Sequence, residues 1–212
     1  NWNVINMLNA KYIIAPGSLN DDNLTILDVN QQRKEVLYLN EAVLPRAYFV
    51  SEVRFLPSEK DVVAFMNTTE FDPAKMALTS VALDTSAGFD TGGSVQVTDY
   101  TPNRVVLNVE TERPAFLVLA DAYYPKGWTA RVAGVETPIY QVNHVLRGVS
   151  VPAGNYAVEF KFLPRSYQIA SQISTISCDI VWLSLLGVLI YQNREKIKNL
   201  KKKRPTPAKS NR

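Results

Sequence analysis

The chain has 212 residues, of which 46% are apolar, so it can bury a core of ordinary domain size and is not an intrinsically disordered chain. Its 23 lysines and arginines against 20 acidic residues give a formal charge of +3, which does not by itself indicate nucleic-acid binding. The single cysteine, Cys178, excludes an internal disulfide, and the residues before it cannot build a cysteine-based metal site or nucleophile.

The charges are unevenly distributed along the chain. Residues 194–212 contain nine lysines or arginines and one acid, so this end carries +8 and the preceding residues carry −5. An acidic body joined through an apolar stretch to a basic end is typical of a membrane-anchored protein with a cytoplasmic tail. Because the chain opens at Asn1 without a methionine or a signal-peptide pattern, we expect it to be part of a longer protein.

Residues 1–93 predict a mixed α/β lead-in. Ser58 is a suitable N-cap for a helix, and Asp72-Pro73 is a suitable start for a shorter one. The predicted elements, in chain order, are a helix at 2–9, strands at 11–15, 24–28, 35–39 and 46–51, a helix from Ser58 to about residue 67, and the short helix after Asp72-Pro73.

Residues 94–165 predict an antiparallel β-sandwich region, because short apolar or alternating runs are separated by Gly, Pro, Asn or Asp. Ala133-Gly134 and Pro152-Ala153-Gly154-Asn155 each predict a hairpin, since glycine supplies the positive φ that a tight reversal needs. The expected fold is therefore mostly β: a sandwich-like extracytoplasmic domain with minor helices, plus one C-terminal transmembrane helix. The predicted strands are 95–98, 104–109, 115–120, 128–132, 137–141, 145–151 and 156–162.

Residues 166–193 predict the transmembrane helix. The 23 residues 169–191 carry one charge and, at about 1.5 Å per residue, can cross a hydrocarbon layer of roughly 30 Å. The alternative is an amphipathic helix of a soluble protein with a lysine-rich extension. The basic residues directly after the apolar run favour the membrane, and the positive-inside rule predicts residues 1–165 outside and the tail 194–212 in the cytoplasm. From residue 205 onward the tail is predicted to be disordered.

A polar stripe runs along this predicted helix. Gln168, Gln172, Thr175 and Asp179 are spaced by four, three and four residues, which places them on one face. An ionised carboxylate that faces lipid near mid-bilayer costs about 2.5–3.5 kcal/mol. We therefore expect Asp179 to face neighbouring helices that are missing from this chain, to face a wet cavity, or to be protonated.

The sequence contains no catalytic constellation, and we predict no catalytic residue, metal or cofactor. His144 is the only histidine, and the acidic loop at 20–23 lacks the spacing of an EF-hand. Carboxylates that could in principle pair for glycoside hydrolysis are Asp99, Glu110, Asp121 and Glu136, but nothing in the sequence sets the 5–10 Å separation that this chemistry needs.

The segment 121–128 is rich in aromatic and polar residues. Aromatic ring faces beside polar groups are what sugar-binding surfaces use, because a ring packs against the apolar face of a pyranose. The alternative is that Tyr123 and Trp128 only cap the core. The candidates for carbohydrate contact are Tyr123, Tyr124, Trp128, Tyr140 and Arg147.

Four segments, in order and followed by a hydrophobic helix, resemble the C-terminal region of the YfhO family of bacterial membrane proteins over nearly the whole chain. They are LNAKYII at 8–14, LPRAYFV at 44–50, YYPKGW at 123–128 and VPAGNYAVEF at 151–160. The family is similar to polytopic C-type glycosyltransferases, which take a sugar from a lipid-linked donor outside the cytoplasmic membrane. Its members are implicated in decorating cell-surface polymers such as lipoteichoic acid.

The resemblance implies an extracytoplasmic β-rich accessory domain on the bacterial cytoplasmic membrane, with a last helix that returns the chain to the cytoplasm. The expected partners are the bilayer, missing helices of the parent protein, and a lipid-linked sugar or cell-surface glycan, but not nucleic acid. The family's catalytic acid lies in an early loop that this chain lacks, so no catalytic residue carries over. Two alternatives stay open: a membrane-anchored carbohydrate-binding or interaction module without catalysis, and a free-standing hydrolase.

Overall fold

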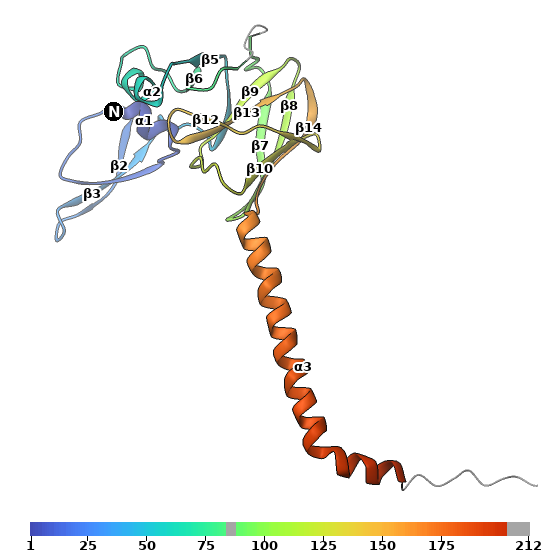
Figure 1. Cartoon of the computed structure of the whole chain (residues 1–212). Coiled ribbons are helices and arrows are strands. Elements are labelled where there is room, and N and C mark those ends of the chain that lie inside the picture. Colours follow the sequence, from blue (N-terminus) through green and yellow to red (C-terminus); the bar gives the residue numbers. More distant parts are fainter. Residues whose placement is uncertain (84–87, 203–212) are drawn as a thin grey trace, which may run out of the picture. The chain divides into compact units, whose positions relative to one another are not determined.

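A computed structural model describes residues 1–83 and 88–202, with side chains up to Arg194 (Figure 1). The chain divides into two units, Asn1–Leu163 and Pro164–Arg212. The described part of the first unit is mostly β, and the described part of the second is one long helix. This confirms the prediction of a mostly β chain with one long apolar helix near its C-terminus.

The helices and strands have the following bounds, in chain order. The first unit contains α1 (Trp2–Met7), β1 (Tyr12–Pro16), β2 (Leu24–Asn30), β3 (Glu35–Asn40), β4 (Ala47–Val50), β5 (Glu52–Phe55), α2 (Glu59–Met66), β6 (Met76–Thr79), β7 (Ser94–Thr101), β8 (Arg104–Thr111), β9 (Ala115–Leu119), β10 (Trp128–Val132), β11 (Val135–Thr137), β12 (Tyr140–Val142), β13 (Leu146–Val151) and β14 (Gly154–Phe162). The second unit contains α3 (Arg165–Lys202).

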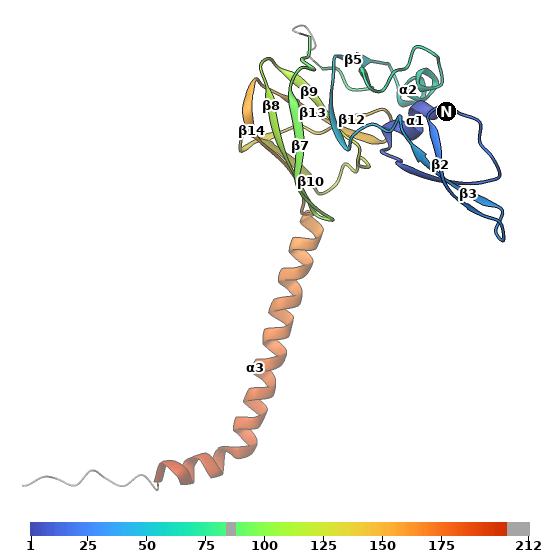
Figure 2. The same cartoon turned by 180° about the vertical axis from the view of Figure 1, so that it is seen from behind.

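Two antiparallel sheets form the sandwich (Figures 1 and 2). One has the order β11-β10-β14-β8-β7 and the other the order β12-β13-β9-β4. Strand β8 alternates between buried and more exposed positions, as expected of a strand with one face on the core. The core between the sheets includes Phe49, Leu107, Leu117, Val149 and Phe160.

The four-stranded sheet is covered on both faces. Its second face packs against α1, α2 and the β5–β6 pair through a separate apolar cluster that includes Met7, Val62, Leu78 and Phe116. Every residue of β4 and β9 is therefore buried, and both strands have continuous apolar sequences rather than alternating ones. The sheet lies in the middle of three layers.

The lead-in and the sandwich region share this sheet, because β4 pairs with β9 through Ala47↔Leu119. The rest of the lead-in includes a small antiparallel sheet of order β1-β3-β2. One of its faces buries Tyr38, whereas Tyr12 and Ile14 on the neighbouring strand are exposed.

The structure contradicts two of the predicted elements. No helix follows Asp72-Pro73: the amides of Lys75 and Met76 turn back to the carbonyl of Asp72, and the chain enters β6, which pairs in parallel with the unpredicted β5. The predicted strand at 137–141 is two strands in different sheets, separated by Pro138, which has no N–H to donate to a ladder.

The two predicted hairpins have different outcomes. The turn at Ala133-Gly134 is confirmed, since both residues have positive φ (50° and 81°) and Val132 pairs with Val135. The turn at 152–155 is not a hairpin, because β13 and β14 belong to different sheets and the chain crosses the sandwich there. Pro152 lacks the N–H that would continue the β13 ladder, and Gly154, with φ of 141°, allows the redirection.

Candidate functional site

The aromatic segment 121–127 connects β9 to β10 and so crosses from one sheet of the sandwich to the other. Backbone hydrogen bonds anchor it at both ends. The Tyr123 amide donates to the Val145 carbonyl at 2.6 Å, and the Leu163 amide donates to the Gly127 carbonyl at 2.7 Å. Gly127 has a φ of 96°, which only glycine adopts without strain.

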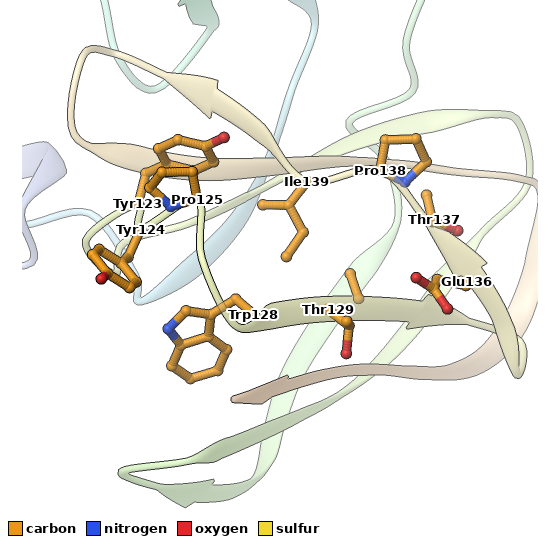
Figure 3. Close-up of a pocket in the computed structure, with 10 residues that line it drawn as sticks. Tyr123, Tyr124, Pro125, Trp128, Thr129, Glu136, Thr137, Pro138 and Ile139 are labelled. Carbon is orange, nitrogen blue, oxygen red and sulfur yellow. The ribbon is translucent and has the colours of Figure 1, made fainter. Parts of the chain in front are cut away.

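This segment forms one wall of a pocket of about 180 Å³ (Figure 3). Rings stand on one side of the pocket, and the hydroxyls of Thr129 and Thr137 and the Glu136 carboxylate stand on the other. Small-molecule sites usually measure about 300–1,000 Å³, so this pocket has room for one small ring rather than an extended ligand. The lining residues are Tyr123, Tyr124, Pro125, Trp128, Thr129, Ala130, Glu136, Thr137, Pro138 and Ile139.

Three of the five residues predicted to contact carbohydrate line this pocket: Tyr123, Tyr124 and Trp128. Tyr124 is the most open of them, with 53% of its surface exposed. Tyr140 does not line the pocket; it packs on the ring of Phe116, with the ring centroids 6.3 Å apart. Arg147 also lies outside the lining and is 4% exposed.

Arg147 holds the segment in place. Its Nε and Nη2 donate to the Ala122 carbonyl at 2.9 and 2.8 Å, and its guanidinium carbon lies 3.8 Å from the centroid of the Trp128 ring. Burial lowers the pKa of the Arg147 guanidinium from its usual value, and Asp121 and Tyr100 oppose this change. The guanidinium occupies one face of Trp128, so any ligand must use the other face or the ring edge.

A second polar cluster joins Arg46, directly before β4, and Tyr100 of β7 to the start of the segment. Arg46 donates to the Asp121 carboxylate at 2.9 Å, Tyr100 donates to the same oxygen at 3.1 Å, and Arg46 donates to the Asn9 side chain at 3.2 Å. Burial and the Asp121 charge raise the pKa of the Tyr100 hydroxyl. Sequence analysis missed this cluster, because its members lie up to 112 positions apart. The only signal was that Asn9, Arg46 and Asp121 lie in or beside the quoted motifs.

Two of the four carboxylates considered for hydrolysis form ion pairs. Asp121 binds Arg46, and Asp99 binds Arg104 at 2.6 Å. Glu136 lines the aromatic pocket, whereas Glu110 lines a separate hollow of about 390 Å³ beside Asp90. Asp121 and Asp99 are thus bound to arginines, and Glu136 and Glu110 line different hollows.

His144 is part of a surface cluster around the Glu59 carboxylate. The His144 Nδ1 lies 2.9 Å from Glu59 Oε2, and the Ser80 hydroxyl donates to Glu59 Oε1 at 2.5 Å. The serine and the histidine both bind the carboxylate rather than each other, so they do not form a nucleophile–base pair. The cluster ties α2 to the turn between β12 and β13. Within residues 1–83 and 88–194, no group of three His, Cys, Asp or Glu is suited to hold a metal.

The predicted polar stripe lies on α3. The part of this helix that is long and apolar enough to cross a membrane is Arg165–Arg194, and Asp179 lies at its middle. The Thr175 hydroxyl donates to the Ser171 carbonyl at 3.0 Å, whereas the described residues offer no partner to the Asp179 carboxylate. None of this helix window is buried.

Comparison with known families gives one match. Residues 84–174 match the family described as bacterial membrane protein YfhO. The match confirms the resemblance over the strands β7–β14 and the start of α3, including the motifs at 123–128 and 151–160; the motifs at 8–14 and 44–50 lie outside it. No curated protein and no solved structure matches the chain. The family and the apolar helix together indicate a membrane protein.

Proposed function

We propose that this chain is the extracytoplasmic accessory domain and last membrane helix of a polytopic protein related to lipid-linked-sugar glycosyltransferases. In this role it holds an acceptor or polymer near a catalytic site that lies elsewhere in the parent. The observation that carries the proposal is the order of parts: a mostly β unit, then at once an apolar span, then a strongly basic end. By the positive-inside rule, the β unit lies outside the bacterial cytoplasmic membrane and the tail lies inside.

The aromatic pocket supports a glycan ligand. Tyr123, Tyr124 and Trp128 offer ring surface, and Thr129, Thr137 and Glu136 offer hydroxyl and carboxylate groups within one small hollow. This combination suits a single sugar unit, since a pyranose has both an apolar face and a rim of hydroxyls. Arg147 contributes by holding Trp128 and the Ala122 carbonyl in position.

The polar stripe supports a helical partner in the same parent protein. Gln168, Gln172, Thr175 and Asp179 are exposed on α3. A carboxylate at the middle of a span is costly against lipid and far less so against the polar groups of another helix. We propose that missing helices of the parent pack along this stripe.

A second candidate is a membrane-anchored carbohydrate-binding module without associated catalysis. The pocket favours it as much as it favours the accessory role, because the pocket requires no second domain. The two candidates differ in the parent protein: membranes that contain the full-length parent transfer sugar to an acceptor under the first proposal and only bind glycan under the second.

Sidedness is tested by thiol labelling in intact cells. Val135→Cys and Ser210→Cys are each placed in a Cys178→Ser background, and a membrane-impermeant maleimide is added before and after permeabilisation. We expect residue 135 to be labelled in intact cells and residue 210 only after permeabilisation. The reverse pattern would refute the proposed topology.

Glycan contact is tested by measuring the binding of cell-wall glycans to the chain in nanodiscs. Tyr124→Ala should weaken binding about tenfold or more, because it removes the most exposed ring of the pocket. Tyr12→Ala is the matched control, since Tyr12 is 60% exposed on a different sheet. Equal binding by both variants, or no binding by the unchanged chain, would remove the sugar-contact proposal.

A further inference from the structure

Three aromatic rings gather where the β unit ends. The ring of Phe162, the last residue of β14, lies 5.3 Å from that of Trp128 and 6.4 Å from that of Tyr124, measured between centroids. The next residue, Leu163, is 45% exposed. These four residues are called the aromatic rim below. Trp128 is partly buried, but Tyr124 presents more than half of its surface.

The covalent chain keeps this rim close to the start of the apolar helix. The Leu163 amide is bonded to the Gly127 carbonyl, next to Trp128, and α3 begins two residues later at Arg165. Three residues can extend over at most about 10 Å, so Phe162 lies within about that distance of the first residue of α3. Chain geometry alone sets this limit.

The length of the span places its first turn in the headgroup layer. A helix of about 20 residues crosses the hydrocarbon core, and the candidate span has 30, so about five residues at each end extend into a headgroup layer. The first turn fits that layer, because it contains Arg165, Tyr167 and Gln168 rather than aliphatic residues.

The rim has the composition of a membrane-interface surface. Tyrosine and tryptophan are enriched where bilayers meet water, because one end of the ring is apolar and the other carries a hydrogen-bonding group. Lys126, between Tyr124 and Trp128 in the sequence, is exposed and can approach lipid phosphates. Lys161, one residue before Phe162, is also exposed.

We propose that the aromatic rim docks on the phospholipid headgroups of the leaflet in which α3 begins. The rings lie at headgroup depth and Lys126 faces phosphate, so the β unit has a second attachment to the bilayer besides its covalent link. The inference does not rest on glycan binding. Tyr124 and Trp128 also line the pocket, so the pocket becomes a site next to the membrane surface.

The test uses single-tryptophan chains in nanodiscs of phosphatidylcholine and phosphatidylglycerol that contain a headgroup-nitroxide lipid. One chain carries Trp2→Phe and Trp182→Phe and so keeps Trp128; the control carries Trp128→Phe and Trp182→Phe and so keeps Trp2. Trp2 lies in α1, which packs on the opposite face of the four-stranded sheet from the five-stranded sheet that contains Trp128 (Figures 1 and 2). Two packed layers separate the residues by roughly 20 Å.

We expect the nitroxide lipid to reduce the emission of Trp128 at least about twofold and that of Trp2 by much less. Absence of quenching at Trp128, or equal quenching at both positions, would overturn the proposal. Failure of glycan binding while Trp128 is still quenched would remove the sugar-contact proposal and leave this one standing.

A second measurement leaves the tryptophans unchanged. Lys126→Cys and Val135→Cys, each with Cys178→Ser, are spin-labelled, and collision of the label with a water-soluble nickel chelate is compared. Trp128 begins β10, and Val135 comes just after the other end of this strand. The strand from Trp128 to Val132 spans about 13 Å, so the two labelled sites are well separated. We expect collision at 126 to be at least twofold lower in nanodiscs than at 135. Equal accessibility at the two sites would refute headgroup contact.

Discussion

Strand β9 and the second half of the apolar segment in α3 have similar composition but opposite surroundings. Every residue of β9 (Ala115–Leu119) is fully buried between the layers of the β unit. In α3 the apolar side chains are open, with exposures such as 58% at Ile180, 67% at Leu183 and 53% at Ile190. Leaving one such side chain in water costs about 1.5–3 kcal/mol relative to burial. The apolar side chains of α3 therefore need a cover that the described residues of the chain do not supply.

Polar groups show the same contrast. In the β unit, a buried polar side chain can bind a distant part of the chain: the Asn143 side-chain oxygen accepts from the Leu78 amide at 2.8 Å. In α3 the hydroxyls of Thr175, Ser177 and Ser184 each donate to the carbonyl four residues earlier. A helix in lipid must satisfy its polar groups internally, because the hydrocarbon layer offers no water.

The largest expected effect comes from removing a buried side chain of β9. Phe116→Ala should lower the free energy of unfolding of the β unit by about 3–5 kcal/mol, because it leaves a cavity between packed layers. Leu185→Ala in α3 is the control and should leave that free energy unchanged, since Leu185 is 51% exposed and belongs to the other unit. Urea unfolding in nanodiscs measures both. A similar loss in the two variants would mean that the units do not unfold independently.

The next effect concerns the charge in α3. Asp179→Leu should make membrane insertion of the isolated span more favourable by about 2.5–3.5 kcal/mol, because it removes a carboxylate from the bilayer centre. Ser177→Leu, on the opposite face of the helix, is the matched control and should change insertion much less. A glycosylation-mapping assay reports the inserted fraction. Equal insertion of the unchanged span and Asp179→Leu would place residue 179 away from mid-bilayer.

A smaller effect is expected from Arg147, a buried polar side chain of the β unit. Arg147→Lys keeps the charge but loses the two hydrogen bonds to the Ala122 carbonyl and the contact of the guanidinium with the Trp128 ring. The free energy of unfolding should therefore fall by about 1–3 kcal/mol. Arg131→Lys on the exposed face of β10 should change it by less than about 0.5 kcal/mol. The urea midpoints of the two variants are compared. Equal midpoints would contradict a structural role for the Arg147 guanidinium.

The smallest effect concerns Asp90, a carboxyl of the β unit that is held by hydrogen bonds within the fold. The Gly92 amide, followed by Arg113 and Thr111, holds the pKa of the Asp90 carboxyl below its ordinary value. A carboxyl whose folded pKa is lowered stabilises the fold above its unfolded pKa, and this contribution is lost as pH falls through the folded value. Between pH 6 and pH 3 the urea midpoint of Asp90→Asn should therefore fall less steeply than that of the unchanged chain.

Glu112→Gln, which borders the same hollow as Asp90, is measured beside it, so that loss of a nearby negative charge is separated from loss of the Asp90 contacts. Parallel curves for the unchanged chain and Asp90→Asn would show that the Gly92 and Arg113 contacts do not favour the ionised form in solution.

Local patterns predicted much of the element list. The helix at 2–9, the strands at 11–15, 24–28 and 35–39 and the helix capped by Ser58 all occur within a few residues of their predicted bounds. In α3 the helix continues to Lys202, beyond the predicted end of the span at 193, because no proline or glycine intervenes before Pro205. The residues from 205 to the end, predicted to be disordered, lie outside the described part of the chain.

Pairing over long distances was not predictable from these patterns. Strand β6 is a short apolar run without periodicity. Its partner β5 comes earlier in the sequence, and helix α2 lies between the two strands. Arg147 reaches Trp128 because β13 lies beside β9 in register Arg147↔Leu119 and β9 leads directly into the aromatic segment. Arg46 meets Asp121 for the same kind of reason, through the register Ala47↔Leu119.

The sequence alone determined the mostly β class, the apolar span, its basic end and the family resemblance, because each depends on composition or on spacing within one segment. Only the tertiary structure decided that β13 and β14 lie in different sheets, that Arg147 covers Trp128, and that the Phe162 ring packs beside those of Tyr124 and Trp128. These contacts depend on which strands pair and in what register. Many alternative pairings satisfy the same alternation of apolar and polar residues, and packing of the whole unit selects one of them.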